Sequence, residues 1–198
     1  MVERRGLVER ETGETRVKVE IDLDGTGRYQ VNTGSGILDH LLAQLSRHGL
    51  FDLNIEAKGD LETGWHHLVE DVGIALGRAL HEAVGDGRGI VRTGHALVPL
   101  DETLAQVVVD LSGRGYAVID AALTGDTVET LPGDLVRHIL ETMAVEARMT
   151  LHARVLYGAN AHHKAEALFK ALARALRAAV QVDPRLEGQM PSTKGTIG

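Results

Sequence analysis

Apolar and polar residues alternate in several short segments of the chain. In residues 15–23 an apolar side chain occupies every second position, which is the period of a half-buried strand. The turn residues Asp24-Gly25 follow, so we expect a hairpin whose return strand is 29–33. Residues 51–57 alternate in the same way. Further strand patterns lie at 96–100, 105–111, 116–122 and 150–157.

Other segments repeat their apolar residues at helical spacing. Residues 37–48 carry leucine or isoleucine every three or four positions, and Gly49 suits the end of a helix. A longer helix is expected at 66–84. Two more are expected at 134–148 and 162–182, and the last ends before Asp183-Pro184.

The order strands, helix, strand, helix therefore occurs twice, in halves at about 10–85 and 90–182. This order predicts an α+β fold with internally duplicated halves, each with helices packed on one face of a mixed β-sheet. The whole chain, 1–198, is expected to form one domain. Residues 183–198 have almost no large apolar side chains and are expected to be a mobile tail.

Composition narrows the classes of function. The chain has 198 residues, of which 43% are hydrophobic, and a formal charge of −7 without a basic block, which argues against nucleic acid as the main partner. No apolar run approaches the roughly 18 residues of a membrane span, and the first residues lack the apolar core of a secretory signal. There is no cysteine for disulfides or thiolate ligands. We expect a cytoplasmic protein that has neither a membrane nor a nucleic acid as partner.

One five-residue pattern, HHxxE, is present twice, 96 positions apart. His40 precedes the first copy by 26 positions, and His138 precedes the second by 24. Imidazole and carboxylate groups are the ligands of borderline divalent metals such as Mn, Fe, Co, Ni and Zn. A single pair of histidines on a helix is more often a surface or core feature, but two matching sets indicate metal binding. The copies consist of His66, His67 and Glu70, and of His162, His163 and Glu166.

The geometry of a helix separates the two histidines of each pair. Adjacent residues point roughly 100° apart, so they cannot easily bind one ion side by side, but each can reach a different ion. The glutamate three or four positions later shares the face of one or both. The sequence therefore predicts a two-metal site made from a duplicated half.

Three other histidines and a glycine-rich segment have plainer interpretations. We expect His81 and His95 to be structural or solvated, and His152 to lie next to the ligands without being one. The glycines at 85, 87 and 89 follow a helix and not a strand, so a dinucleotide-binding loop is not expected.

The chain resembles the imidazoleglycerol-phosphate dehydratase family over essentially its whole length. The resemblance lies in motifs that follow the family's order and spacing: Glu9-Arg10 with Glu14, Asp39-His40-Leu41-Leu42 with Gln44 and His48-Gly49, His66-His67 with Val69-Glu70-Asp71, Asp101-Glu102, Asp110 to Arg114, Leu151-His152, Asn160 to Ala171, Asp183-Pro184-Arg185 and Pro191 to Gly195. Leu68, Gly115 and Gly34-Ser35-Gly36 depart from the family's pattern, but none of them is at a ligand position.

The resemblance implies a hydro-lyase of histidine biosynthesis that converts D-erythro-imidazoleglycerol phosphate to imidazole acetol phosphate with two Mn²⁺ ions per subunit. The proton to be lost is on an unactivated carbon. A metal at an imidazole nitrogen favours the imidazolate, and this electron-rich ring can expel the neighbouring hydroxyl. The family pattern assigns His40, His67, Glu70 and His162 to one metal and His66, His138, His163 and Glu166 to the other.

The resemblance also implies roles around the metals. Glu14 would be the base for the carbon proton, and His48 would assist the departing hydroxyl. The catalytic set also includes Glu70 and Glu166. Substrate would contact Glu14, His48 and the histidines at 40, 66, 67, 162 and 163. It would also contact further residues, of which the arginines, Ser192 and Lys194 would hold the phosphate: Gln44, Arg92, Arg114, Lys170, Ser192, Thr193 and Lys194. The family forms large symmetric homo-oligomers of about 24 subunits with sites at subunit contacts.

Other classes of protein fit the sequence less well. A ferritin-like storage bundle uses Glu-x-x-His motifs and no strands, whereas here histidines dominate and strands are abundant. A binuclear hydrolase normally has bridging aspartates, and none stands out in this sequence. A pure binding protein would have little use for Glu14 and the polar tail.

Overall fold

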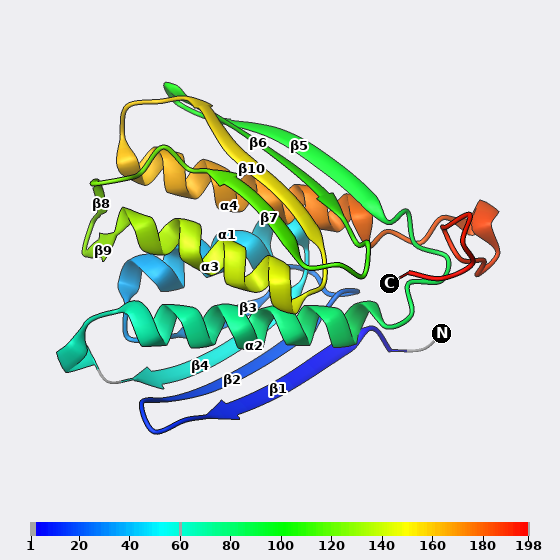
Figure 1. Cartoon of the computed structure of the whole chain (residues 1–198), viewed down its shortest axis with the longest axis horizontal. Coiled ribbons are helices and arrows are strands. Elements are labelled where there is room, and N and C mark those ends of the chain that lie inside the picture. Colours follow the sequence, from blue (N-terminus) through cyan, green and yellow to red (C-terminus); the bar gives the residue numbers. More distant parts are fainter. Residues whose placement is uncertain (1–2, 60, 198) are drawn as a thin grey trace.

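Two four-stranded sheets enclose a layer of four helices (Figure 1). The structure is a computed structural model that describes residues 3–59 and 61–197. The first sheet has the order β1-β2-β4-β3 and the second β5-β6-β10-β7. The fold is therefore α+β with helices against one face of each sheet, as the sequence predicts.

The first half contains four strands, two α-helices and a 3-10 turn. Their bounds are β1 (Arg5–Glu11), β2 (Thr15–Asp22), β3 (Tyr29–Asn32), α1 (Gly36–Gly49), β4 (Asp52–Gly59), η1 (Leu61–Thr63) and α2 (His66–Val84). The second half repeats this order with one added pair of short strands. Its elements are β5 (Thr93–Leu100), β6 (Thr103–Asp110), β7 (Tyr116–Asp120), β8 (Thr127–Val128), β9 (Leu131–Pro132), α3 (Gly133–Glu146), β10 (Thr150–Tyr157), α4 (Ala161–Ala179) and η2 (Pro184–Leu186).

The expected hairpin between 15–23 and 29–33 is wrong in its pairing. β2 is bordered by β1 and β4 on its two edges, so no edge remains for β3. Asp52, the first residue of β4, accepts hydrogen bonds from the backbone N–H groups of Thr26 and Arg28 at 2.7 and 3.0 Å. These bonds direct the turn toward β4, and β3 pairs with β4 in parallel. β1, for which no strand was expected, takes the antiparallel place instead.

Close helix–sheet contacts depend on glycine at equivalent positions of the halves. Gly6 on β1 lies so close to Ala79 of α2 that a Cβ would come within 1.9 Å of the Ala79 carbonyl oxygen. Gly94 on β5 is placed in the same way against Ala175 of α4, at 2.1 Å. The absence of a side chain allows each helix to lie directly on the first strand of its sheet.

The helices of the two halves pack against one another in crossed pairs. α1 contacts α4, and α2 contacts α3, so each pair joins one helix from each half. The buried faces of these helices are rich in leucine and alanine, which fill the core together with the inward valines and isoleucines of the strands. Side chains distant in sequence are thereby placed across the helix pairs.

The tail lies beside the loop that joins the halves. Gly89 N–H donates to the Gln189 carbonyl at 2.9 Å, Asp183 N–H donates to the Gly89 carbonyl at 2.8 Å, and Ile90 and Val182 form an isolated bridge. Backbone contacts therefore hold the start of the tail. Among the described residues, no helix is long and apolar enough to cross a membrane.

Candidate metal and substrate site

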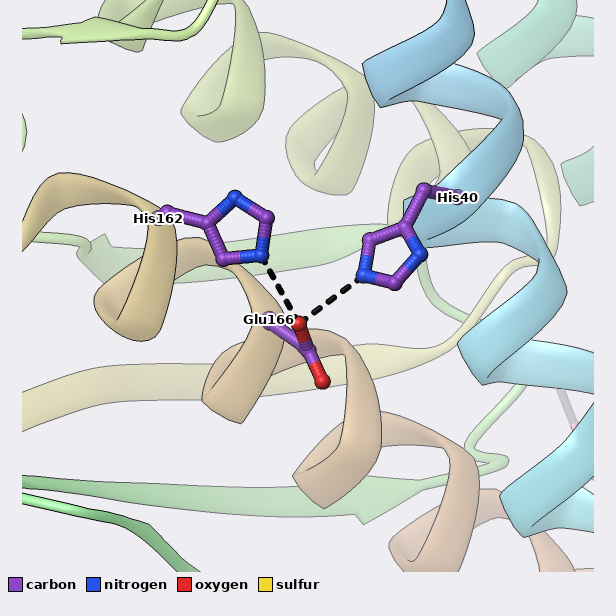
Figure 2. Close-up of side chains that lie close together, drawn as sticks. All are labelled: His40, His162 and Glu166. Carbon is purple, nitrogen blue, oxygen red and sulfur yellow. Dashed lines mark hydrogen bonds and ion pairs between the residues drawn. The ribbon is translucent and has the colours of Figure 1, made fainter.

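His40, His162 and Glu166 converge between α1 and α4 (Figure 2). His40 Nε2 lies 2.8 Å from Glu166 Oε2, and His162 Nε2 lies 3.0 Å from the same oxygen. His162 and Glu166 are four residues apart, so they share one face of α4. His40 reaches them from α1. We call these three residues the α1–α4 cluster.

His66, Glu70 and His138 form the equivalent group between α2 and α3. The rings of His66 and His138 are stacked with their centroids 4.7 Å apart. Glu70 approaches both histidines, with Oε2 at 4.0 Å from His66 Nε2 and Oε1 at 3.9 Å from His138 Nε2. We call this group the α2–α3 cluster. It repeats the arrangement of the α1–α4 cluster, as expected for a duplicated half.

Each glutamate lies with different histidines from those in the metal-ligand sets that the family resemblance implies. Glu166, and not Glu70, lies with His40 and His162, and Glu70 lies with His66 and His138. The reason is the spacing of four residues, which keeps the first histidine and the glutamate of each HHxxE copy on one helix face. Within one chain, the expected exchange of the two glutamates between the sets is therefore wrong.

The second histidine of each pair points away from its neighbour. The rings of His66 and His67 are edge-on with centroids 6.2 Å apart, and those of His162 and His163 are edge-on at 6.3 Å. His67 Nδ1 lies 3.6 Å from Glu14 Oε2, and His163 Nδ1 lies 2.7 Å from Glu102 Oε2. Neither ring belongs to a cluster of its own chain, which agrees with the separation expected from helix geometry.

The clusters have the donors that a divalent cation requires. In each, two imidazole nitrogens and one carboxylate oxygen lie within 4.8 Å of one another. His138 Nε2 is buried and has no hydrogen-bond partner among the described residues, a costly state that a bound cation would relieve. The side chains present therefore fit a borderline metal such as Mn²⁺ or Zn²⁺.

Electrostatics favour the ionised form of the glutamate in the α1–α4 cluster. Burial opposes ionisation of Glu166, but hydrogen bonds from His40, Lys170 and His162 outweigh it and hold its pKa at about 2. Lys170 Nζ lies 2.5 Å from Glu166 Oε1, so it occupies the oxygen that faces away from the histidines. Glu166 is thus a carboxylate near neutral pH, as a metal ligand must be.

Gln44 and His48 extend the α1–α4 cluster along α1. Gln44 Nε2 lies 3.5 Å from His40 Nε2, and Gln44 Oε1 lies 3.1 Å from His48 Nε2. Burial, together with the positive charges of Lys170 and Arg174, lowers the pKa of His48. His48 is therefore a neutral imidazole at neutral pH, held near the cluster by Gln44.

Glu14 sits at the tip of the β1–β2 hairpin, 56% exposed and beside His67. The hairpin is held to α2 by Asp71, whose carboxylate accepts hydrogen bonds from Arg10 Nε at 2.8 Å and from Thr15 Oγ1. Thr12 Oγ1 closes the turn by accepting from the N–H of Glu14 at 3.2 Å. The sequence alone assigned no role to Asp71. An acidic residue directly after HHxxE, on the buried face of the helix, could have indicated one.

A polar cavity of about 420 Å³ lies between the tail and the start of the second sheet. Arg92 bonds Asp110 through Nε at 2.7 Å and Nη2 at 3.1 Å, and its Nη1 donates to the Pro191 carbonyl at 3.1 Å. The other lining residues are polar or cationic apart from Pro191: Ser112, Arg114, Pro191, Ser192, Thr193, Lys194 and Thr196. All the residues expected to hold the phosphate are therefore together.

The starts of the two helices that carry the HHxxE copies and this polar cavity lie at opposite ends of the molecule. α2 and α4 begin at the end where the HHxxE copies are located, and the tail lies at the other end (Figure 1). Each of these helices has 19 residues, which corresponds to about 28 Å. A small substrate cannot reach both places on one chain.

The remaining histidines lie away from the clusters. His152 and His95 are exposed on the outer face of the second sheet, where both are paired in register with Val108 of β6. The expectation that His152 lies next to the ligands is wrong for this chain, because alternation on β10 turns Leu151 and Ala153 to the helices and His152 away from them. Burial lowers the pKa of His81, near the end of α2.

Fold and site together define a duplicated α+β protein with two histidine–glutamate clusters suited to divalent cations. The family model for imidazoleglycerol-phosphate dehydratase matches residues 33–176. The imidazoleglycerol-phosphate dehydratases of Dehalococcoides mccartyi strain CBDB1 and of Roseiflexus sp. are 55% and 53% identical, over 100% and 98% of this chain and 99% and 98% of their own.

Solved structures agree with these relatives. The imidazoleglycerol-phosphate dehydratase of Staphylococcus aureus has a TM-score of 0.81 at 38% identity, covering 90% of this chain and 99% of that one. The Pyrococcus furiosus structure, in complex with (S)-C348, has a TM-score of 0.77 at 37% identity, with 96% and 99% covered. The chain belongs to the imidazoleglycerol-phosphate dehydratase family. It is a hydro-lyase of histidine biosynthesis, EC 4.2.1.19.

Proposed function

We propose that the enzyme uses two Mn²⁺ ions per subunit to convert D-erythro-imidazoleglycerol phosphate to imidazole acetol phosphate. The observation that supports this proposal most directly is the pair of equivalent three-residue clusters in a chain with no cysteine. A mixed imidazole and carboxylate set suits Mn²⁺, and a third histidine donor per ion would complete a set of four. When bound, the cations would supply positive charge that makes the imidazole ring of the substrate easier to deprotonate.

The α1–α4 and α2–α3 clusters would each hold one ion. His40, His162 and Glu166 would hold the first, and His66, Glu70 and His138 the second. Lys170 keeps Glu166 ionised and oriented through its contact with Oε1. With three or four protein ligands, each ion would still be accessible to substrate and water.

Glu14 is the proposed base for the carbon proton. Its exposed carboxylate sits on a hairpin that Asp71 fixes to α2, close to the first HHxxE copy. A carboxylate that makes few hydrogen bonds retains lone pairs for the proton of the substrate. His48 is neutral at pH 7, so its proposed part is to orient the departing hydroxyl by a hydrogen bond through a ring nitrogen.

The substrate phosphate would bind in the cavity beside the tail. Arg114 and Lys194 provide cationic donors there, Ser192 and Thr193 provide hydroxyls, and Arg92 is already oriented by Asp110. Charge-assisted hydrogen bonds from such groups suit a phosphate dianion. The bond from Arg92 to the Pro191 carbonyl would hold the tail over the phosphate.

The active site would be shared between subunits of a homo-oligomer. His67 and His163 point away from the clusters of their own chain, and the phosphate cavity lies at the far end from the cation donors. Neighbouring copies would therefore provide the fourth ligand of each ion and the phosphate cavity. A closed symmetric assembly, of about 24 subunits by resemblance to the family, would give every copy the same contacts. We place the assembly in the cytoplasm.

The test is an assay of purified protein with imidazoleglycerol phosphate after chelator treatment and after addition of Mn²⁺. We expect loss of turnover on chelation, recovery with Mn²⁺ and two bound ions per chain by elemental analysis. Full turnover in protein that holds one ion or none would contradict the two-metal proposal. Light scattering measures the assembly in the same samples, and a monomer with full activity would contradict the shared site.

A further inference from the structure

The two halves place a glutamate at the same point of their first hairpin. Glu14 precedes Thr15 in the β1–β2 hairpin, and Glu102 precedes Thr103 in the β5–β6 hairpin. Both threonines are buried and lie against a glycine, Gly59 at the end of β4 in one half and Gly158 directly after β10 in the other. Each glutamate also faces the second histidine of an HHxxE copy. The two carboxylates are therefore structural equivalents.

Their environments differ strongly. Glu14 Oε2 is 3.6 Å from His67 Nδ1, too far for a hydrogen bond, and His67 Nδ1 has no hydrogen-bond partner among the described residues. Glu102 Oε2, in contrast, is 2.7 Å from His163 Nδ1. The two carboxylates thus relate differently to the ring nitrogen that each faces.

The other oxygen of Glu102 is fully engaged with backbone and threonine donors. Glu102 Oε1 accepts from the N–H groups of Asn160 at 2.9 Å and Ala159 at 3.1 Å, and from Thr103 Oγ1 at 3.0 Å. The two backbone donors lie where α4 begins, since Asn160 caps that helix. The carboxylate is thereby fixed relative to the backbone that carries His163.

We propose that Glu102 is a positioning residue that fixes the ring and tautomer of His163 for metal binding. This proposal rests on the two-metal function proposed above. The proton of His163 is then on Nδ1, which donates to Glu102, and the lone pair of Nε2 is left for the ion of a neighbouring copy. Metal-bound histidines commonly donate their other ring N–H to a carboxylate, which orients the ring and makes it a better ligand.

The contrast between the halves gives the equivalent carboxylates different tasks. Glu102 uses both oxygens for fixed hydrogen bonds and cannot approach a substrate. Among the described residues, none donates a hydrogen bond to the carboxylate of Glu14, which remains free to take a proton. Duplication thus supplied two carboxylates at one structural position, of which one orients a ligand and the other is available for the reaction.

The E102Q variant tests this assignment because glutamine has the same shape. Its amide oxygen can still accept from the N–H groups of Ala159 and Asn160, which leaves the NH₂ group facing His163 Nδ1. That group would donate to Nδ1 and force the histidine proton onto Nε2, where the metal should bind. We expect one of the two Mn²⁺ sites per chain to weaken about 10- to 100-fold, with the melting temperature nearly unchanged.

Binding is measured by titrating Mn²⁺ into chelator-treated full-length protein and determining the concentration of free Mn²⁺ by EPR. E14Q, the equivalent substitution in the first half, is the matched control and should bind both ions like the wild type. Wild-type affinity at both sites in E102Q would overturn the proposal. A large drop in melting temperature with equal weakening of both sites would assign Glu102 to helix capping and also overturn it. Failure of the proposed function would be recognised separately, because wild-type protein itself would then bind no Mn²⁺.

Discussion

His40 and Glu166 are 126 residues apart in sequence, yet His40 Nε2 lies 2.8 Å from Glu166 Oε2. The contact exists because α1 of the first half packs against α4 of the second. The same crossing of α2 and α3 joins Glu70 to His138. Each cluster is therefore made by both halves of the duplication, and neither half could hold a cation with three ligands alone.

Removal of His138 should abolish one cation site. Replacement by Ala in the H138A variant leaves His66 and Glu70 as the only ligands of the α2–α3 cluster. Together with the histidine of a neighbouring copy, the ion would have three protein ligands instead of four and would bind much more weakly. We expect one Mn²⁺ per chain instead of two by elemental analysis, and turnover at least about 100-fold lower. H152A, on the outer face of the second sheet, is the control and should keep both ions and wild-type turnover.

Glu14→Gln should bind metal normally but dehydrate very slowly. The carboxamide has nearly the same shape but cannot accept the carbon proton, so kcat should fall by about 10²- to 10⁴-fold with little change in melting temperature. Steady-state kinetics with both proteins at saturating Mn²⁺ measure the effect. Unchanged kcat would leave Glu14 with no part in proton transfer.

Asp71→Asn should act through the hairpin that carries Glu14. Arg10 and Thr15 donate to different oxygens of the Asp71 carboxylate, and asparagine has an NH₂ group in place of one of them, so one of the two bonds is lost. We expect the free energy of unfolding to fall by about 1–3 kcal/mol and kcat to fall, with Mn²⁺ binding preserved. Urea unfolding and kinetics are measured on the same preparation, with E11Q on the exposed side of β1 as control. A variant with weaker Mn²⁺ binding and normal kcat would contradict this role.

Asp52 should make stability depend on pH in the acid range. Hydrogen bonds from the Arg28 guanidinium, and from the Thr26 and Arg28 backbone, hold the pKa of Asp52 well below its usual range. A carboxyl with a lowered pKa in the folded state stabilises the fold above its unfolded pKa of about 4, and this contribution is lost as the pH falls below that value.

Wild type should therefore exceed D52N in free energy of unfolding by about 1–2 kcal/mol at pH 7, and the difference should shrink toward pH 3. Urea titrations at both pH values measure it, and D120N on the exposed face of β7 is the control. A difference that stays constant from pH 7 to pH 3 would show that ionisation of Asp52 is not responsible.

Mixed assemblies should reveal the shared site. H162A lacks a cluster ligand and K194A lacks a phosphate donor, so each alone should be nearly inactive. If neighbouring chains complete one site, subunit exchange between the two variants should restore activity to at most about a quarter of wild type. The reason is that some sites then combine an intact α1–α4 cluster from one variant with an intact phosphate cavity from the other. H162A mixed with E166Q, both defective in the α1–α4 cluster, should recover nothing. Equal recovery in the two mixtures would contradict sharing between subunits.

Local sequence patterns were sufficient to predict most of the helices and strands. The alternation in 15–23 and the helical spacing in 66–84 depend on burial of one face, which each segment expresses by itself. The pairing of β3 did not follow, because it depends on Asp52 binding the turn at Thr26 and on β1 occupying the other edge of β2. These are contacts between segments that no local pattern records.

By itself the sequence predicted the candidate ligands and determined the separation of His66 from His67, because a helix fixes the angle between adjacent side chains. It left open which histidine of each copy shares a face with Glu70 or Glu166, and the structure groups each glutamate with the first histidine. Only the tertiary structure decided which third ligand each pair meets, through the packing of α1 on α4 and α2 on α3. It also decided that Glu102 binds His163 while Glu14 stays free of His67, because equivalent hairpins can have different local partners once the chain has folded.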